Sequence, residues 1–131
     1  MRQAAVWGLL LLVGFAAAVH LTRRDPPPGR KEPATSAASA ALAQGRALFE
    51  RTCMACHGPE AAGSPQGPPL VHRIYEPGLH ADEAFLLAVQ RGVRAHHWRF
   101  GDMPPVPNVS PEEVKLITAY VRGLQKRAGI F

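Results

Sequence analysis

The chain's only two cysteines, Cys53 and Cys56, lie in the stretch CMACH, in which His57 follows directly. Cysteine pairs at this spacing have three common uses. A thiol–disulfide site of the thioredoxin type needs a preceding strand and a βαβ frame, whereas the residues before Cys53 have helical periodicity. A zinc site needs a further cysteine or histidine pair at matching spacing. The later histidines do not form such a pair: His72, His80, His96 and His97.

The third use is covalent attachment of haem, for which C-x-x-C-H is the signature. Two thiols add across the two vinyl groups on one edge of the haem ring, and the next residue, His57, is then placed to bind the iron from one face. The thioether links keep haem on the protein even when the chain opens. Five residues alone also match by chance, so a second signal is needed.

Met103 provides this second signal. Haem iron takes a sixth ligand, and the methionine thioether is the ligand of high-potential electron carriers. Met54 lies inside the attachment loop and cannot reach the opposite face of the ring. Met103 lies in FGDMPPVP, a proline-rich loop 46 residues after His57. Together with CMACH, this position predicts iron ligation by Met103 in place of ordinary burial in a core.

Three helices are predicted after residue 40. Apolar residues in 41–53 recur at three-to-four spacing, and a second helix is expected from Asp82, as N-cap, to about Gly92. The third begins with a capping box at Ser110 and has Pro111 at its first position. Its apolar residues repeat at helical period: Val114, Ile117, Tyr120, Val121 and Leu124. Basic side chains at 122, 126 and 127 gather towards its end, where the helix dipole favours them. No strand pair with a hairpin turn stands out.

Residues 40–124 resemble a small class I c-type cytochrome, a bacterial family with one haem. In that family, a glycine eight residues and an aromatic residue four residues before the first cysteine pack the first helix against the last. Here these positions hold Gly45 and Phe49. Ile117 and Tyr120 resemble the residues of the last helix that contact these two positions in the family.

The stretch Gly67-Pro68-Pro69-Leu70 resembles the G-P-x-L motif of the same family. The resemblance implies that the Pro68 carbonyl accepts a hydrogen bond from the proximal histidine, and that Leu70 packs on haem. A hydrogen bond from Nδ1–H to this carbonyl leaves Nε2 free for the iron and makes the imidazole a stronger electron donor to it. One covalently bound haem c is implied, with iron ligands His57 and Met103. The implied cofactor-binding residues are Cys53, Cys56, His57, Pro68, Leu70 and Met103.

Other parts of the region depart from the family pattern. HRIYEPGLH, residues 72–80, matches no family motif; Tyr75 or Arg73 is a candidate to reach a haem propionate, and a solvated loop is the alternative. Trp98 is a candidate to line the haem pocket or an ordinary core aromatic. The four remaining histidines of the region are able to bind copper, although such histidines are more often plain surface residues.

We therefore expect an all-α cytochrome c domain in residues 40–131, with three main helices and long loops around the haem. Two filled axial positions imply one-electron transfer and not catalysis at the iron, so we expect an electron carrier that is not an enzyme. The alternative is a dedicated electron-accepting subunit of a periplasmic dehydrogenase or reductase complex. A thiol–disulfide oxidoreductase is a remote alternative.

The expected partners are redox proteins: a membrane complex, an oxidase, a reductase or a dehydrogenase. A small-molecule substrate is not expected, because the sequence offers no site for one. Nucleic acid is not expected either, because binding it requires basic residues clustered on a folded face. The chain has a net charge of +5, but residues 1–40 carry +3 of it.

The N-terminal segment, residues 1–21, has a basic start and an apolar run. Two predictions compete: a cleaved secretory signal with small residues at 16–18, or a membrane anchor near the ~17–25 residues that cross a bilayer. Residues 22–39 are rich in Pro, Ala and Ser and are predicted to form a disordered linker. A long linker suits an anchored protein, so anchoring on the periplasmic side of the bacterial inner membrane is slightly favoured over a soluble periplasmic form.

Overall fold

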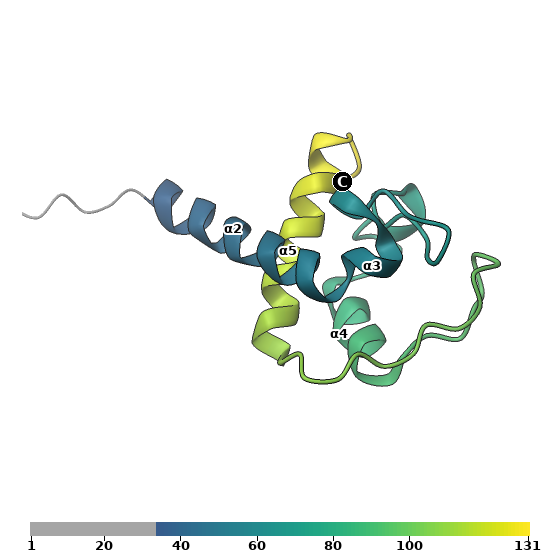
Figure 1. Ribbon diagram of the computed structural model, residues 1–131. Helices are drawn as coiled ribbons and strands as arrows, with labels where there is room; N and C mark the ends of the chain where they lie inside the picture. Colours follow the sequence, from purple (N-terminus) through teal and green to yellow (C-terminus); the bar gives the residue numbers. More distant parts are fainter. Residues whose placement is uncertain (1–33) are drawn as a thin grey trace, which may run out of the picture. The chain divides into compact units, whose positions relative to one another are not determined.

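The computed structural model describes residues 34–131, which fold into helices joined by long loops (Figure 1). The elements are the helices α2 (Ala34–Thr52), α3 (Met54–His57), α4 (Asp82–Arg91) and α5 (Pro111–Arg127), and the 3-10 turns η1 (Pro59–Ala61) and η2 (Arg73–Tyr75). Pairing of extended backbone within this range is limited to isolated bridges. The predicted all-α class, with α2, α4 and α5 as the three main helices, is confirmed.

The predicted N-terminal segment, residues 1–21, lies outside the described residues, as do residues 22–33 of the predicted linker. In the part of the chain that is described, no helix has the length and apolar character needed to cross a bilayer.

The end of the predicted linker is wrong, because residues 34–39 form the first turns of α2. The stretch ATSAAS, residues 34–39, lacks large apolar side chains, which suggested disorder, but alanine has the highest intrinsic helix propensity. Residues 37–40 are exposed, so these turns need no apolar partner of their own. They continue a helix whose later turns are packed, and extending an existing helix is easier than nucleating one.

The hydrophobic core lies where α2 crosses α5 (Figure 1). Phe49 is fully buried, and its ring centroid lies 5.6 Å from that of Tyr120. A Cβ atom at Gly45 would overlap the carbonyl oxygen of Leu116 and lie 3.1 Å from Cβ of Tyr120. The predicted docking of the first and last helices at Gly45 is confirmed. The closest approach is to the backbone of Leu116, however, and not to the tyrosine ring.

The start of α5 is fixed by the predicted capping box. The backbone N–H of Glu113 donates to Oγ of Ser110 (3.2 Å), and the N–H of Ser110 donates to Oε2 of Glu113 (2.9 Å). These two bonds satisfy donors that have no partner inside the helix. The predicted apolar stripe is buried in full: Val114, Ile117, Tyr120, Val121 and Leu124.

The expected role of Asp82 as an N-cap is wrong. The N-cap of α4 is Ala81, which makes no side-chain cap, and Asp82 is the first helical residue. Its Oδ1 accepts a hydrogen bond from Nε of Arg122 at 2.8 Å. Because Asp82 lies inside the first turn and not at the cap position, its carboxylate forms a charge-assisted bond with the guanidinium instead.

Arg122 also departs from expectation, because it is only 9% exposed and lies away from the end of α5. Besides Asp82, its guanidinium donates to the carbonyl oxygen of Tyr75 (2.6 Å), to that of His80, and to Oε1 of Gln125 (2.8 Å). Burying an arginine is costly unless its donors are satisfied, and here they fix the loop that precedes α4.

The crossing of α2 and α5 predicts that a Gly→Ala substitution has opposite effects on stability at two glycines of these helices. Gly45→Ala should destabilise the holoprotein by about 1–3 kcal/mol, because the added methyl overpacks against the Leu116 backbone. Gly123→Ala, on α5, should stabilise it by about 0.5–1 kcal/mol, because its Cβ has ordinary contacts and alanine favours helix. At Gly123 the nearest atom, Cδ2 of Leu42, lies at 3.7 Å. Denaturant unfolding measures both, and equal effects would show that the helices do not meet at Gly45.

Candidate haem site

A cavity of about 470 Å³ opens between α3, α4, α5 and the loop that follows α4. All six predicted cofactor-binding residues line it: Cys53, Cys56, His57, Pro68, Leu70 and Met103. Much of the remaining wall is apolar and comes from α4 and α5: Ala84, Phe85, Leu87, Val89, Val114 and Ile117. An apolar cavity with a few convergent polar groups is the usual form of a cofactor site.

His57 ends α3, a single helical turn, and is buried. Its Nδ1 lies 2.9 Å from the carbonyl oxygen of Pro68. A carbonyl only accepts, so Nδ1 carries the proton and Nε2 is left with a free lone pair. Burial lowers the pKa of His57, and the hydrogen bond to Pro68 partly opposes this shift. The neutral imidazole, which is the metal-binding form, is therefore favoured.

The two cysteines differ in their surroundings. Cys53 is half-buried and Cys56 is exposed, and both thiols are free. Burial raises the pKa of the Cys53 thiol, and the hydrogen bond with Thr52 (3.3 Å) opposes this shift. Catalytic cysteines of thiol–disulfide enzymes have a lowered pKa, so this environment argues against that alternative.

The loop of residues 63–70 packs directly on the turn that carries the cysteines. Oγ of Ser64 donates to the carbonyl oxygen of Cys56 at 2.6 Å. A Cβ atom at Gly67 would lie 2.8 Å from the same oxygen, which explains a glycine at this position. The N–H of Leu70 donates to the carbonyl of Ala61 at 2.8 Å. These contacts place Pro68 and Leu70 against the cavity.

Met103 is half-buried and is positioned by the end of α4. The backbone groups of Val93 and Met103 exchange two hydrogen bonds, each of 2.9 Å. Gly92 ends α4 with a φ of 73°, and a Cβ atom there would overlap the carbonyl oxygen of Met103. The sequence indicated a helix end near Gly92 but gave no sign of this bridge, because a single pair of hydrogen bonds leaves no periodic pattern.

Two aromatic residues complete the wall. Trp98 lines the cavity, and its Nε1 donates to Oη of Tyr75 at 3.1 Å. Burial raises the pKa of Tyr75, and the bond with Trp98 partly opposes this shift. Of the two residues considered as propionate ligands, Tyr75 lines the cavity, whereas Arg73 is exposed and is not part of the wall.

Gln125 has a supporting role that the sequence reasoning missed. It is 1% exposed, and its Nε2 donates to the carbonyl oxygens of Leu70 (2.8 Å) and Tyr75 (3.1 Å). The sequence feature that could have indicated this role is a polar residue directly next to the apolar stripe of α5. A buried amide requires partners, and these partners belong to the loop that forms one side of the cavity.

The residues present fit a covalently bound haem. Two thiols, one neutral imidazole with a held Nδ1–H, and one thioether line the same largely apolar cavity. This donor set would supply two attachment points and two ligands for the iron.

The comparisons with known proteins give one match. The family model for cytochrome c matches residues 42–125. Neither the curated proteins nor the solved structures yielded a match. The matched range covers more than half of the chain and includes CMACH, Pro68, Leu70 and Met103. The chain therefore belongs to the cytochrome c family, whose members bind haem c covalently and transfer electrons.

Proposed function

We propose that this haem-binding electron-transfer protein carries one haem, attached through Cys53 and Cys56, with His57 and Met103 as iron ligands. The observation that carries the proposal is that both thiols, a neutral imidazole and a thioether line one and the same cavity. Haem, when bound, supplies a centre that gains and loses one electron. The chain's own residues hold and orient it and exclude water.

His57 is the most strongly oriented of the proposed ligands. The hydrogen bond from its Nδ1 to the Pro68 carbonyl fixes the tautomer and the ring plane. It also makes Nε2 a better donor, which is the usual effect of such a partner on a ligating histidine. Pro68 is in turn fixed by the loop that packs on Cys56, so attachment and ligation depend on one local structure.

The apolar wall sets the electrostatics of the site. Phe85, Val89 and Ile117, with Leu70, keep water away from the cavity. A dry environment disfavours the oxidised, ferric form, which carries the extra positive charge. It therefore raises the reduction potential. A thioether ligand acts in the same direction.

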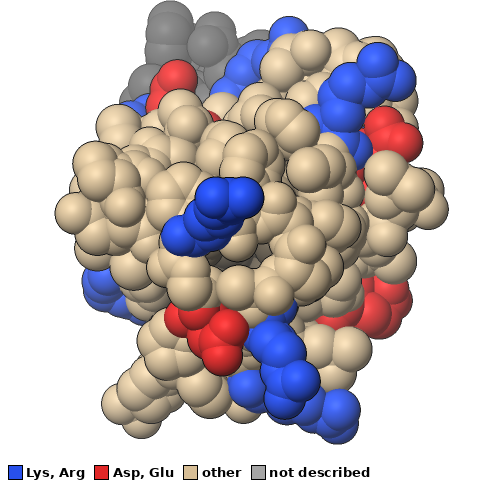
Figure 2. Space-filling model, turned by 90° about the vertical axis from the view of Figure 1, so that its right-hand side faces the viewer, with Lys and Arg blue, Asp and Glu red and all other residues tan. Residues whose placement is uncertain are grey.

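Electron exchange is proposed to occur near Cys56, the more exposed of the two cysteines, in brief encounters with redox proteins through small interfaces. On the face shown in Figure 2, uncharged side chains predominate and basic and acidic groups are interspersed. On this face the interspersed charges support protein partners of low affinity over nucleic acid, which requires a basic patch. We place the chain in the periplasm, anchored by residues 1–21.

Covalent attachment is tested with the two cysteines. Wild-type protein should keep its colour in the protein fraction after acid–acetone extraction, because thioether bonds hold haem. Cys53→Ser and Cys56→Ser should each yield little stable holoprotein. Met54→Leu is the matched control: it changes an exposed side chain in the same turn and should leave attachment intact. Complete loss of colour from the wild type into acetone would contradict the proposal.

Axial ligation is tested at Met103. Met103→Ala should abolish the near-infrared sulfur-to-iron band of the oxidised protein, lower the reduction potential and open the iron to small ligands. Gly92→Ala should weaken the same band, because the added methyl displaces the Met103 backbone.

Gly101→Ala is the control for Gly92→Ala. Both glycines have positive φ, so both substitutions strain the backbone, at a cost of about 1–3 kcal/mol each. A Cβ atom at Gly101 meets nothing within 4 Å, however. The band should therefore survive Gly101→Ala. A band that persists in Met103→Ala would assign the sixth ligand to another residue.

Anchoring is tested by fractionation of the native host cells. Haem-containing protein should sediment with membranes and be released by detergent, because an apolar segment of this length is able to span a bilayer. Protease cleavage between residues 22 and 33 should release a soluble, redox-active domain. A mature chain that begins near residue 19 and is found free in the periplasm would instead show a cleaved signal.

A further inference from the structure

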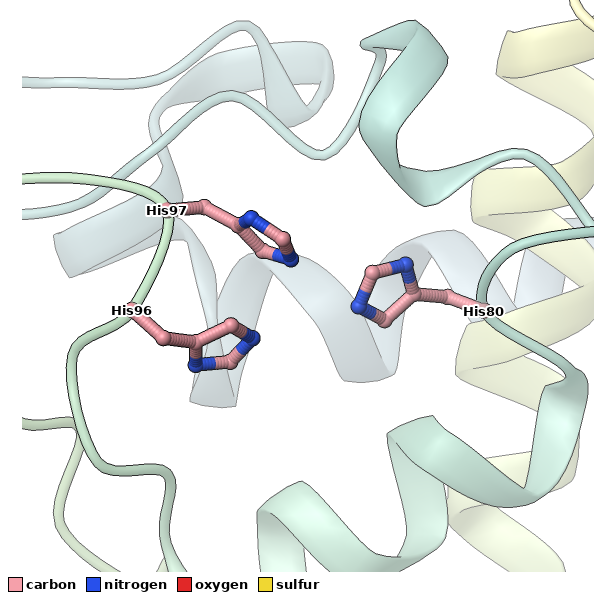
Figure 3. A group of neighbouring side chains, drawn as sticks. All are labelled: His80, His96 and His97. Atoms are coloured by element: carbon pink, nitrogen blue, oxygen red, sulfur yellow. The ribbon is translucent and has the colours of Figure 1, made fainter.

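Three histidines outside the proposed haem ligands converge on one point: His80, His96 and His97 (Figure 3). One ligand nitrogen from each lies within 4.8 Å of the other two. His80 belongs to the loop before α4, and His96 and His97 belong to the loop after it. The three rings point from these two loops into a shared space (Figure 3).

Backbone contacts fix the protons on two of these rings. Nδ1 of His80 lies 2.6 Å from the carbonyl oxygen of Ile74, and Nδ1 of His96 lies 2.8 Å from that of Arg94. Because a carbonyl only accepts, both Nδ1 atoms carry a proton, and in the neutral rings both Nε2 atoms have a free lone pair. Metal-binding histidines show this arrangement, in which the non-ligating nitrogen donates to a carbonyl or carboxylate.

We propose that His80, His96 and His97 form a second metal site, which binds one divalent ion that prefers imidazole, Zn²⁺ or Cu²⁺. Imidazole suits both ions. Three protein ligands leave a fourth position open to water, as in catalytic zinc sites. At metal–nitrogen distances of about 2.0–2.1 Å, tetrahedral ligands lie about 3.4 Å apart, so the nitrogens need only a small movement.

The histidines on the two sides of the proposed site differ in how far their side chains can move. His80 is half-buried, and its carbonyl accepts a hydrogen bond from Arg122, which ties it to α5. His96 and His97 are exposed, so their side chains have room to adjust. The base of their loop is closed by the N–H of Ala95, which donates to Oδ1 of Asp102 at 2.8 Å. A fixed ligand on one side and two adjustable ligands on the other make a site that closes on the ion.

The position of the site has a structural consequence. The ion would join the loop before α4 to the loop that carries Met103, on the wall of the proposed haem cavity, which all three histidines line. It would restrain the segment from Val93 to Met103, whose ends are already paired by two backbone hydrogen bonds. The proposal requires only these three imidazoles and no particular haem ligand, so it stands or falls separately from the proposed function.

The test titrates oxidised holoprotein with zinc chloride in a calorimeter. One equivalent should bind per chain. His96→Gln, His97→Gln and the double variant should each weaken zinc binding by at least about 10-fold. Removing a residue that only hydrogen-bonds a metal ligand commonly costs that much, and these variants remove a ligand itself. His96 and His97 are exposed, so these variants should fold. No uptake by the wild type, or equal uptake by the double variant, would overturn the proposal.

His72→Asn is the matched control. It removes an imidazole from the same pair of loops but keeps an acceptor for the N–H of Ile74, which His72 Nδ1 binds at 3.2 Å. Zinc affinity should be unchanged. A drop equal to that of His97→Gln would show that zinc binds elsewhere and would overturn the proposal.

Two further measurements identify the donors. Paramagnetic resonance of bound Cu²⁺ should show coupling to several nitrogens in the wild type, reduced in His97→Gln. Hydrogen exchange at the amides of Val93 and Met103 should slow with zinc in the wild type and not in the double variant. A haem spectrum that changes in His96→Gln or His97→Gln without any zinc would assign that histidine to the iron and overturn the proposal.

Discussion

The close approach of α2 and α5 at Gly45 is the constraint on which the rest of the structure depends. CMACH follows α2 without a linker: the N–H of Cys53 still donates to the carbonyl of Phe49 at 2.8 Å, as in a continuing helix. The position of both thiols and of His57 is therefore set by how α2 lies on α5. Glycine at the crossing lets the backbones meet, and the Phe49–Tyr120 pair fixes the rotation of α2 one turn later.

A second layer of control comes from buried polar groups on α5. Arg122 and Gln125 bind backbone carbonyls of Leu70, at the end of the G-P-x-L stretch, and of Tyr75, in the loop that leads to α4. That loop has few buried apolar side chains of its own, so polar bonds from a rigid helix must hold it. Such bonds are directional, which makes the position of Leu70 at the cavity more exact than apolar packing alone would.

Sequence reasoning succeeded where the signal was local. CMACH, the capping box at Ser110 and the stripe of α5 each depend on residues a few positions apart. It failed where distant residues compete: Asp82 fits an N-cap by type, but Arg122, forty positions later, takes its carboxylate. The histidine cluster was equally hidden. The sequence shows His96 and His97 as neighbours, but only the fold brings His80 to them.

The loop between α4 and α5 divides into a fixed base and an exposed tip. The base includes the Val93–Met103 bridge and the bond from the Val106 N–H to the carbonyl of Val89, at 2.8 Å. The tip carries His96 and His97 and ends near Phe100, which is 41% exposed. Because Met103 lies in the base, its position depends on α4 more than on the tip. A ligand at the tip would therefore restrain the motion of the loop that carries Met103 and leave the geometry of its base unchanged.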